Sequence, residues 1–188
     1  MLKYSIDYHI KYFEEIAKKL SGYTYKCVIS FVDLYRNTQN NMKNIDLIPM
    51  NLNEMFQIAQ GLASIAKKYN ISLESCAEKI ELTQFGINHG HCIDGELFEK
   101  FLGCKLEVSK DKNQRVECGC MSSIDIGMYN TCKNGCRYCY ANFSPKTVAK
   151  QFMNHDPSSP LISGVIGEDD IVKEKVVKSC KNCQLKLF

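Results

Sequence analysis

The sequence lacks the features that mark membrane, exported and nucleic-acid-binding proteins. No apolar run in its 188 residues approaches the roughly 20 residues that cross a bilayer. Residues 1–12 contain no long apolar segment of the kind found in signal peptides. The formal net charge is only +3, and no block of consecutive basic residues occurs. These absences predict a cytoplasmic protein with no membrane partner and argue against nucleic acid as a partner.

Internal repeats and low-complexity segments are also absent. The hydrophobic fraction of 45% and the charged fraction of 24% are those of an ordinary globular protein. A chain of this length can form one domain with a hydrophobic core. We divide it into a scaffold over residues 1–116 and a cysteine-rich region over residues 117–188, and we expect both to belong to one domain.

The hydrophobic pattern of the first half predicts alternating helices and strands. Helical spacing favours helices over residues 6–20 and 52–69, and short apolar runs favour strands over residues 25–34 and 71–77. Because a helix lies between two strands of buried character, we expect an α/β fold with a parallel sheet. The Asn-rich stretch 36–48 indicates an irregular connection or a short helix.

Shorter elements follow. The sequence predicts a helical turn over residues 81–86, helices over 95–102 and 145–153, a strand over 123–128, and an amphipathic helix within 168–188. The candidate N-caps are Ser5, Asn51 or Asn53, and Asp94, since each short polar side chain precedes a helical pattern.

Cysteine is the residue in excess. The chain has eleven, an odd number, and no export signal. Disulfides rarely persist in a reducing compartment, so many thiols in such a chain indicate metal or redox chemistry.

The strongest motif is Cys132-x3-Cys136-x2-Cys139. Thiolates bind zinc, copper(I) or iron–sulfur clusters. A single zinc usually takes two close pairs of ligands, whereas three thiols within eight residues suit three irons of a cubane cluster and leave the fourth iron open. Gly135 allows the backbone to turn tightly between the first two thiols.

The run from Cys132 to Asn142 resembles the cluster loop of radical S-adenosylmethionine enzymes, and Cys136-Arg137-Tyr138-Cys139-Tyr140-Ala141 is closest to the spore photoproduct lyase branch. The resemblance implies a [4Fe-4S] cluster on the three thiols, whose open iron binds S-adenosylmethionine. One electron then generates a 5′-deoxyadenosyl radical that abstracts hydrogen from a substrate, which we do not identify. A flavodoxin or ferredoxin would supply the electron.

Three other residues are expected at the cofactor. The resemblance implies that Tyr138 contacts the adenine. Asn142 is a candidate to hydrogen-bond the cofactor or to cap the following turn, and Asp125 is a candidate for a buried polar contact there or for a surface position.

A wider resemblance covers nearly the whole chain. Its segments are Cys27–Tyr35, Ser75–Glu78, His91–Asp94, Cys118–Cys120, Ser123–Tyr140 and His155–Leu161. Together they are similar to an uncharacterised bacterial family, a domain of unknown function, whose members are longer. The resemblance implies that about the N-terminal third of the family pattern precedes Met1, and that the sheet here is a partial parallel βα barrel.

A second group of thiols combines Cys118-Gly119-Cys120 with Cys76 and Cys92, which follow or lie beyond the second predicted strand. These four could form a second cluster or a zinc site. Alternatively, one of them supplies the fourth ligand to the Cys132 cluster and closes it, or Cys76 is simply a buried thiol.

The remaining candidates carry weaker signals. We expect Cys27 in the core, assign no role to Cys104, and note a metal-like spacing in Cys180-x2-Cys183. His89, His91 and Glu78 are minor candidates for a site. The main hypothesis is an iron–sulfur protein, and the alternative is a non-catalytic module that zinc or a closed cluster stabilises.

Overall fold

The computed structural model describes residues 4–34, 36–45 and 47–182, and Cys183 lies outside this part. The described residues fall into two compact units: unit 1 contains residues 4–32, 48–123 and 179–182, and unit 2 contains residues 33–34, 36–45, 47 and 124–178. Each unit contains one of the two cysteine groups. The division at residue 116 stays a prediction.

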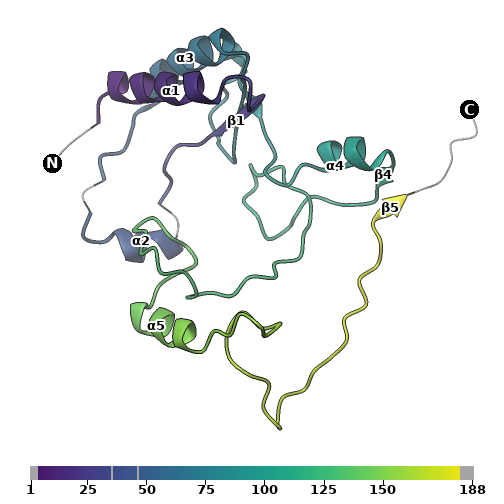
Figure 1. Ribbon diagram of the computed structural model, residues 1–188. Coiled ribbons are helices and arrows are strands. Elements are labelled where there is room, and N and C mark those ends of the chain that lie inside the picture. Colours follow the sequence, from purple (N-terminus) through teal and green to yellow (C-terminus); the bar gives the residue numbers. More distant parts are fainter. Residues whose placement is uncertain (1–3, 35, 46, 183–188) are drawn as a thin grey trace, which may run out of the picture. The chain divides into compact units, whose positions relative to one another are not determined.

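Two helices cover one side of unit 1. Helix α1 spans Ile6–Leu20 and α3 spans Leu52–Lys68, and they lie side by side (Figure 1). The predicted caps are confirmed, because the Ser5 side chain accepts from the N–H of Tyr8 and Asn51 forms a reciprocal capping box with Glu54. Local capping signals therefore placed both helix starts.

The sheet of unit 1 is parallel and has three strands. Strands β1 (Lys26–Ile29), β2 (Ser72–Ser75) and β3 (Asn88–His89) lie in the order β1-β2-β3. Both pairs are parallel, with Cys27 opposite Leu73 and Ser75 opposite His89. The α/β prediction is confirmed, but the strands are shorter than the apolar runs that predicted them. Within the described residues the sheet is not closed, and no barrel is formed.

The core of unit 1 lies between the helices and the sheet. Its buried residues are Ala17, Ile58, Ala59, Leu62, Ile65, Ala66, Ile71, Leu73, Leu82 and Ile87. Cys27 packs against this cluster, as the sequence predicts. Five of the ten come from α3, so this helix contributes the largest share of the apolar area that burial removes from water.

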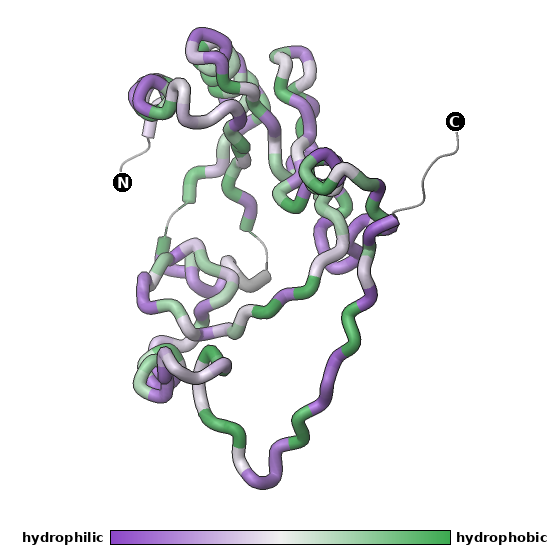
Figure 2. Tube along the Cα trace, turned by 45° about the vertical axis from the view of Figure 1, so that its right-hand side comes forward, coloured by the Kyte–Doolittle hydropathy of each residue, from purple (hydrophilic) through white to green (hydrophobic). Residues whose placement is uncertain are grey.

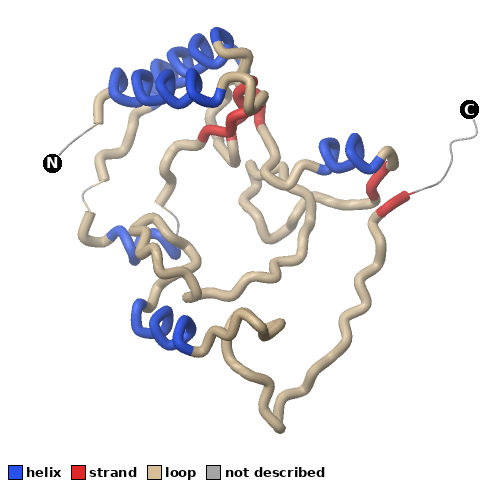
Figure 3. The backbone as a smooth tube through the Cα atoms, viewed as in Figure 1, coloured by secondary structure: helices blue, strands red, loops and turns tan. Residues whose placement is uncertain are grey.

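The rest of unit 1 contains little regular structure. The 3₁₀ turn η1 (Thr83–Phe85) and helix α4 (Gly95–Leu102) lie where the sequence predicts them, and Asp94 caps α4 at Leu97. Strands β4 (Lys105–Leu106) and β5 (Lys181–Asn182) form an antiparallel pair. The chain between β4 and residue 123 is drawn as loop (Figure 3).

Unit 2 is built on two helices, α2 (Arg36–Met42) and α5 (Pro145–Met153). The predicted strand over residues 123–128 is wrong, because these residues pair with no other strand. The amphipathic helix within 168–188 is wrong for its described part. Residues 168–180 run without helix, and apolar and polar residues follow each other along the trace (Figure 2).

No helix in the described residues is long and apolar enough to cross a membrane.

Two leucines of α3 test where the core lies. Leu62 is 8% exposed and Leu52 is 64% exposed. Leu62→Ala should lower the free energy of unfolding by about 3 kcal/mol, because it leaves a cavity between α3 and the sheet. Leu52→Ala should change it by less than about 0.5 kcal/mol. Urea denaturation followed by circular dichroism measures both, and equal losses would contradict this core.

Candidate functional site

The three thiols of the C-x3-C-x2-C motif lie in a loop of unit 2, and hydrogen bonds between the two ends of the loop close it. At the first end the N–H of Asn130 donates to the carbonyl of Ala141 over 2.9 Å. The Asn130 side chain accepts from the N–H groups of Phe143 and Ser144 over 2.9 and 3.1 Å. Asn130 is 6% exposed, and its three hydrogen bonds hold together the two ends of the loop.

The second end of the loop is tied back to its first cysteine. The side-chain amide of Asn142 donates to the carbonyl of Cys132 over 2.6 Å, and its backbone N–H lies 3.3 Å from the sulfur of Cys139. The amide of Asn41 on α2 donates to the carbonyls of Cys139 and Asn142 over 2.6 and 2.9 Å. Asn142 thus joins the first and third cysteines of the motif.

Sequence reasoning missed Asn130 and Asn41. Asn130 has a φ of +59°, a left-handed conformation that asparagine tolerates better than most residues. An isolated Asn before the first thiol was the only available signal for it. Asn41 lies in the Asn-rich stretch that indicated a connection, and nothing local marks its distant partners.

The sulfur-bearing part of the loop faces solvent. Cys132 and Cys136 are exposed, Cys139 is half-buried, and Gly135 between them has a φ of +63° as expected of its tight turn. The Tyr138 hydroxyl donates to the carbonyl of Asp33 over 2.8 Å, while its ring is 42% exposed.

Two further side chains near the loop have simple local roles. Lys133 lies with Nζ 2.9 Å from the centroid of the Phe152 ring on α5. Asp125 is exposed, and its carboxylate accepts from the N–H of Gly127 over 2.7 Å. The structure thus gives Asp125 a surface position, one of the two that the sequence allows.

The four thiols of the second group come together in unit 1. Cys76 follows β2, Cys92 follows β3, and Cys118 and Cys120 lie in the loop after β4. The sulfurs of Cys76 and Cys92 are 3.3 Å apart. Cys118 and Cys120 lie in one buried cluster, and Cys76 packs against it. The structure thus brings these cysteines into one region of unit 1, and a metal site shared by all four stays a prediction.

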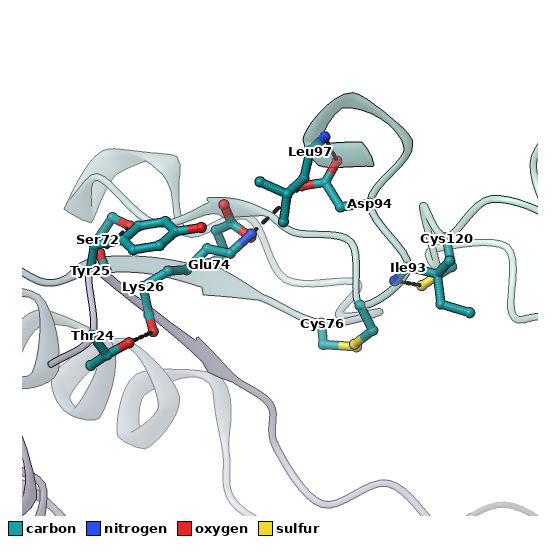
Figure 4. Close-up of polar contacts among 11 residues, drawn as sticks. Thr24, Tyr25, Lys26, Ser72, Glu74, Cys76, Ile93, Asp94, Leu97 and Cys120 are labelled. Atoms are coloured by element: carbon teal, nitrogen blue, oxygen red, sulfur yellow. Dashed lines mark hydrogen bonds and ion pairs between the residues drawn. The ribbon is translucent and has the colours of Figure 1, made fainter. Parts of the chain in front are cut away.

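Backbone hydrogen bonds hold the two segments that carry Cys92 and Cys120. The N–H of Met121 donates to the carbonyl of Ile93 over 3.1 Å, and the N–H of Ile93 lies 3.3 Å from the sulfur of Cys120 (Figure 4). Ala77 joins Cys118 and Cys120 in a small buried cluster, against which Cys76 and Ile93 pack.

An ion-pair network fixes the other side of this group. Lys26 on β1 lies 2.9 Å from the carboxylate of Glu74 on β2 and 3.6 Å from that of Asp94 (Figure 4). The hydrogen bond to Glu74 raises the pKa of Lys26. Glu74 precedes Cys76 by two residues and Asp94 follows Cys92 by two, so the network sets the spacing of the chain segments with these cysteines.

The thiols of this group have different pKa values because they share hydrogen bonds. The bond to Cys76, followed by burial, raises the pKa of Cys92 to about 11. Burial raises the pKa of Cys118. Burial also acts to raise the pKa of Cys120, but the N–H of Ile93 and the neighbouring thiols outweigh it and lower that pKa. The pKa of Cys120 is therefore shifted in the opposite direction from those of Cys92 and Cys118.

Gly119 of the C-G-C element is required by close packing. A Cβ atom there would lie 2.4 Å from two atoms of the His91 imidazole. The ring of His91 thus covers the backbone between Cys118 and Cys120, and this is its visible role in the structure.

The minor candidates Glu78 and His89 form hydrogen bonds with residues outside the two groups of cysteines. The buried carboxylate of Glu78 accepts from the N–H of Phe31 over 2.7 Å. His89 lies 3.3 Å from the Ser75 hydroxyl and 3.0 Å from the Glu81 carboxylate. In the described part of the chain, no group of three or more His, Cys, Asp or Glu side chains lies in a geometry that could hold a metal ion.

The closure of the thiol loop by Asn130 is testable without any cofactor. Asn130→Ala removes the side-chain acceptor and places alanine at a positive φ. Hydrogen exchange of the amides of residues 141–144 should become roughly ten-fold faster, or about 1–2 kcal/mol less protected. Asn134→Ala, in the exposed part of the same loop, should leave this protection unchanged. Equal effects of the two variants would contradict the role of Asn130.

The packing of His91 on Gly119 predicts a rescue. Gly119→Ala should lower the free energy of unfolding of unit 1 by about 1–3 kcal/mol, because the new methyl group overlaps the imidazole. The double variant His91→Ala/Gly119→Ala should recover part of this loss. Denaturation curves of both variants and of His91→Ala alone measure the coupling, and strictly additive losses would show that the two residues do not touch.

Comparison with known proteins gives a single assignment. No curated protein and no solved structure matches the chain. A protein family described as a domain of unknown function matches residues 1–141, a range that contains both cysteine groups. Since this match covers well over half of the sequence, the chain belongs to that family, DUF1848.

Proposed function

We propose that this protein binds a [4Fe-4S] cluster through Cys132, Cys136 and Cys139, and that the cluster acts with S-adenosylmethionine in radical chemistry. The observation that supports this is the closed loop of unit 2, in which Asn130, Asn142 and Asn41 fix the backbone around three thiols. A loop whose own hydrogen bonds set its shape can present three ligands with little loss of conformational entropy on binding.

The donor set fits such a cluster. Three soft thiolates within eight residues suit three iron atoms, and the exposure of Cys132 and Cys136 leaves them accessible from solvent. The N–H of Asn142 at 3.3 Å from the sulfur of Cys139 is a donor of the kind that tunes the potential of iron–sulfur clusters.

The other roles follow from the proposal. The three cysteines would hold the cluster, which supplies one electron to bound S-adenosylmethionine. The exposed ring of Tyr138 would lie against the adenine, with its hydroxyl anchored on Asp33. Asn142 would keep the first and third ligands at a fixed separation, and Asp125 would offer a carboxylate at the approach to the loop.

The context of the proposal is a cytoplasmic protein, where the thiols stay reduced. A flavodoxin or ferredoxin would be its electron donor. The three parallel strands of unit 1 would form part of an incomplete βα barrel.

Anaerobic purification tests the cluster directly. The wild-type protein should contain about four iron and four sulfide per loop site, with the broad visible absorption of a cubane cluster. Cys136→Ala should remove the iron and sulfide of this site, because two thiols cannot hold a cubane. Cys27→Ala, which removes a core thiol outside both groups, should keep them. Wild-type protein without iron and sulfide would refute the proposal.

Radical chemistry has its own test. With dithionite and S-adenosylmethionine, the wild-type protein should form 5′-deoxyadenosine and Cys136→Ala should not. The EPR spectrum of the reduced cluster should change when S-adenosylmethionine is added. A cluster that shows neither response would establish the non-catalytic alternative, in which the cluster only stabilises the loop.

A further inference from the structure

We propose that Cys76, Cys92, Cys118 and Cys120 of unit 1 form a structural site for one zinc ion. This site is separate from the cluster proposed for the Cys132 loop and does not depend on it. The argument uses the distance between sulfurs, the frame that holds the four cysteines, and the small core of the chain segment that they join.

The four cysteines lie in one region of unit 1. The sulfurs of Cys76 and Cys92 are 3.3 Å apart, Cys118 and Cys120 lie in one small buried cluster, and Cys76 packs against that cluster. They come from three places in the sequence, the end of β2, the loop after β3 and the C-G-C element. Four thiols that converge from separate segments are the ligand set of a closed zinc site with four cysteine ligands.

The separation of the sulfurs favours a single metal over a cluster. Zinc–sulfur bonds of about 2.3 Å in a tetrahedron place two ligating sulfurs roughly 3.8 Å apart. The sulfurs of Cys76 and Cys92 are 3.3 Å apart, close to that value. In a cubane the ligating sulfurs belong to different irons and stand much farther apart. The described side chains do not yet form such a tetrahedron, so zinc binding would require the cysteine side chains to rotate toward a common centre.

The frame around the thiols is already built. Lys26 forms ion pairs with both Glu74 and Asp94. The hydrogen bond from the N–H of Met121 to the carbonyl of Ile93 joins the loop that contains Cys92 to the loop that contains Cys120. The N–H of Ile93 reaches the sulfur of Cys120, as backbone donors do for metal-bound thiolates. Cys118 and Cys120 are 6% and 7% exposed, while Cys92 lies at the surface and gives a metal ion a path in.

The described segment between β4 and residue 123 has little regular structure or apolar burial that could stabilise its conformation. Between β4 and residue 123 the described chain has no helix or strand beyond a single bridge, Lys110 with Met121. Cys118 and Cys120 of this segment form a small buried cluster with Ala77, against which Cys76 and Ile93 pack. So little apolar burial does not balance the entropy of ordering a loop of this length, and a structural zinc is one of the usual substitutes for a core.

The first experiment uses the wild-type full-length chain, purified without oxygen and without added chelator. Metal analysis should find about one zinc per chain, and zinc X-ray absorption should show four sulfurs at about 2.3 Å. Zinc below about 0.2 per chain, or a first shell containing nitrogen or oxygen in place of sulfur, overturns the proposal.

Matched double variants then locate the zinc. Cys118→Ser/Cys120→Ser should lose at least about 80% of the zinc and keep its iron and sulfide, because two remaining thiolates cannot close a zinc site. Cys132→Ser/Cys136→Ser should keep the zinc, and Cys27→Ser should keep both metals. Loss of iron and sulfide from the first variant, or of zinc from the second, overturns the assignment.

A cobalt substitution covers the case in which the first variant fails to fold. Zinc in the wild-type chain is exchanged for Co²⁺, and tetrahedral thiolate coordination should give intense ligand-field bands in the red. Weak bands typical of octahedral cobalt overturn the proposal. Because the cluster is measured by iron and sulfide and this site by zinc and cobalt, failure of one proposal is distinguishable from failure of the other.

Discussion

The ion pair between Lys26 and Glu74, extended to Asp94, joins the chain segments that carry Cys76 and Cys92 in unit 1. It joins β1 to β2 and to the residue that caps α4, and all three side chains are largely shielded from water. Removing Lys26 would take the cationic partner away from two partly buried carboxylates, of which, within the described residues, only Asp94 would keep a hydrogen bond, from the N–H of Leu97. The position of Cys76 relative to Cys92 follows from this network.

The two groups of thiols are held in different ways, and the difference bears on their chemistry. In unit 2 a closed loop presents thiols to solvent, as a group that must meet a cofactor requires. In unit 1, tertiary contacts bring the thiols together from distant parts of the sequence, and Cys118 and Cys120 are buried in the same small cluster. Exposed and locally fixed ligands suit an open cluster, whereas buried ligands from distant segments suit a closed structural metal.

Sequence patterns predicted what local interactions determine. The helix starts at Ser5, Asn51 and Asp94 were recognised because a cap and its partner lie three residues apart. The apolar run 25–34 could not give the ends of β1, since pairing stops where β2 stops. Asn41 and Asn130 were missed for the related reason that asparagine side chains in loops carry no sign of a distant partner. The cysteine groups were found because thiols are rare and their spacing carries chemical meaning.

The close thiol pair of unit 1 also needs protection from oxidation. The sulfurs of Cys76 and Cys92 lie 3.3 Å apart, close enough for an oxidant to join them in a disulfide after a small movement. Thiolates are the species that oxidants attack and that lead to disulfides. A d¹⁰ ion such as zinc has no redox chemistry of its own, and it occupies the lone pairs that such reactions use. Zinc bound as proposed would therefore keep the four thiols of unit 1 reduced.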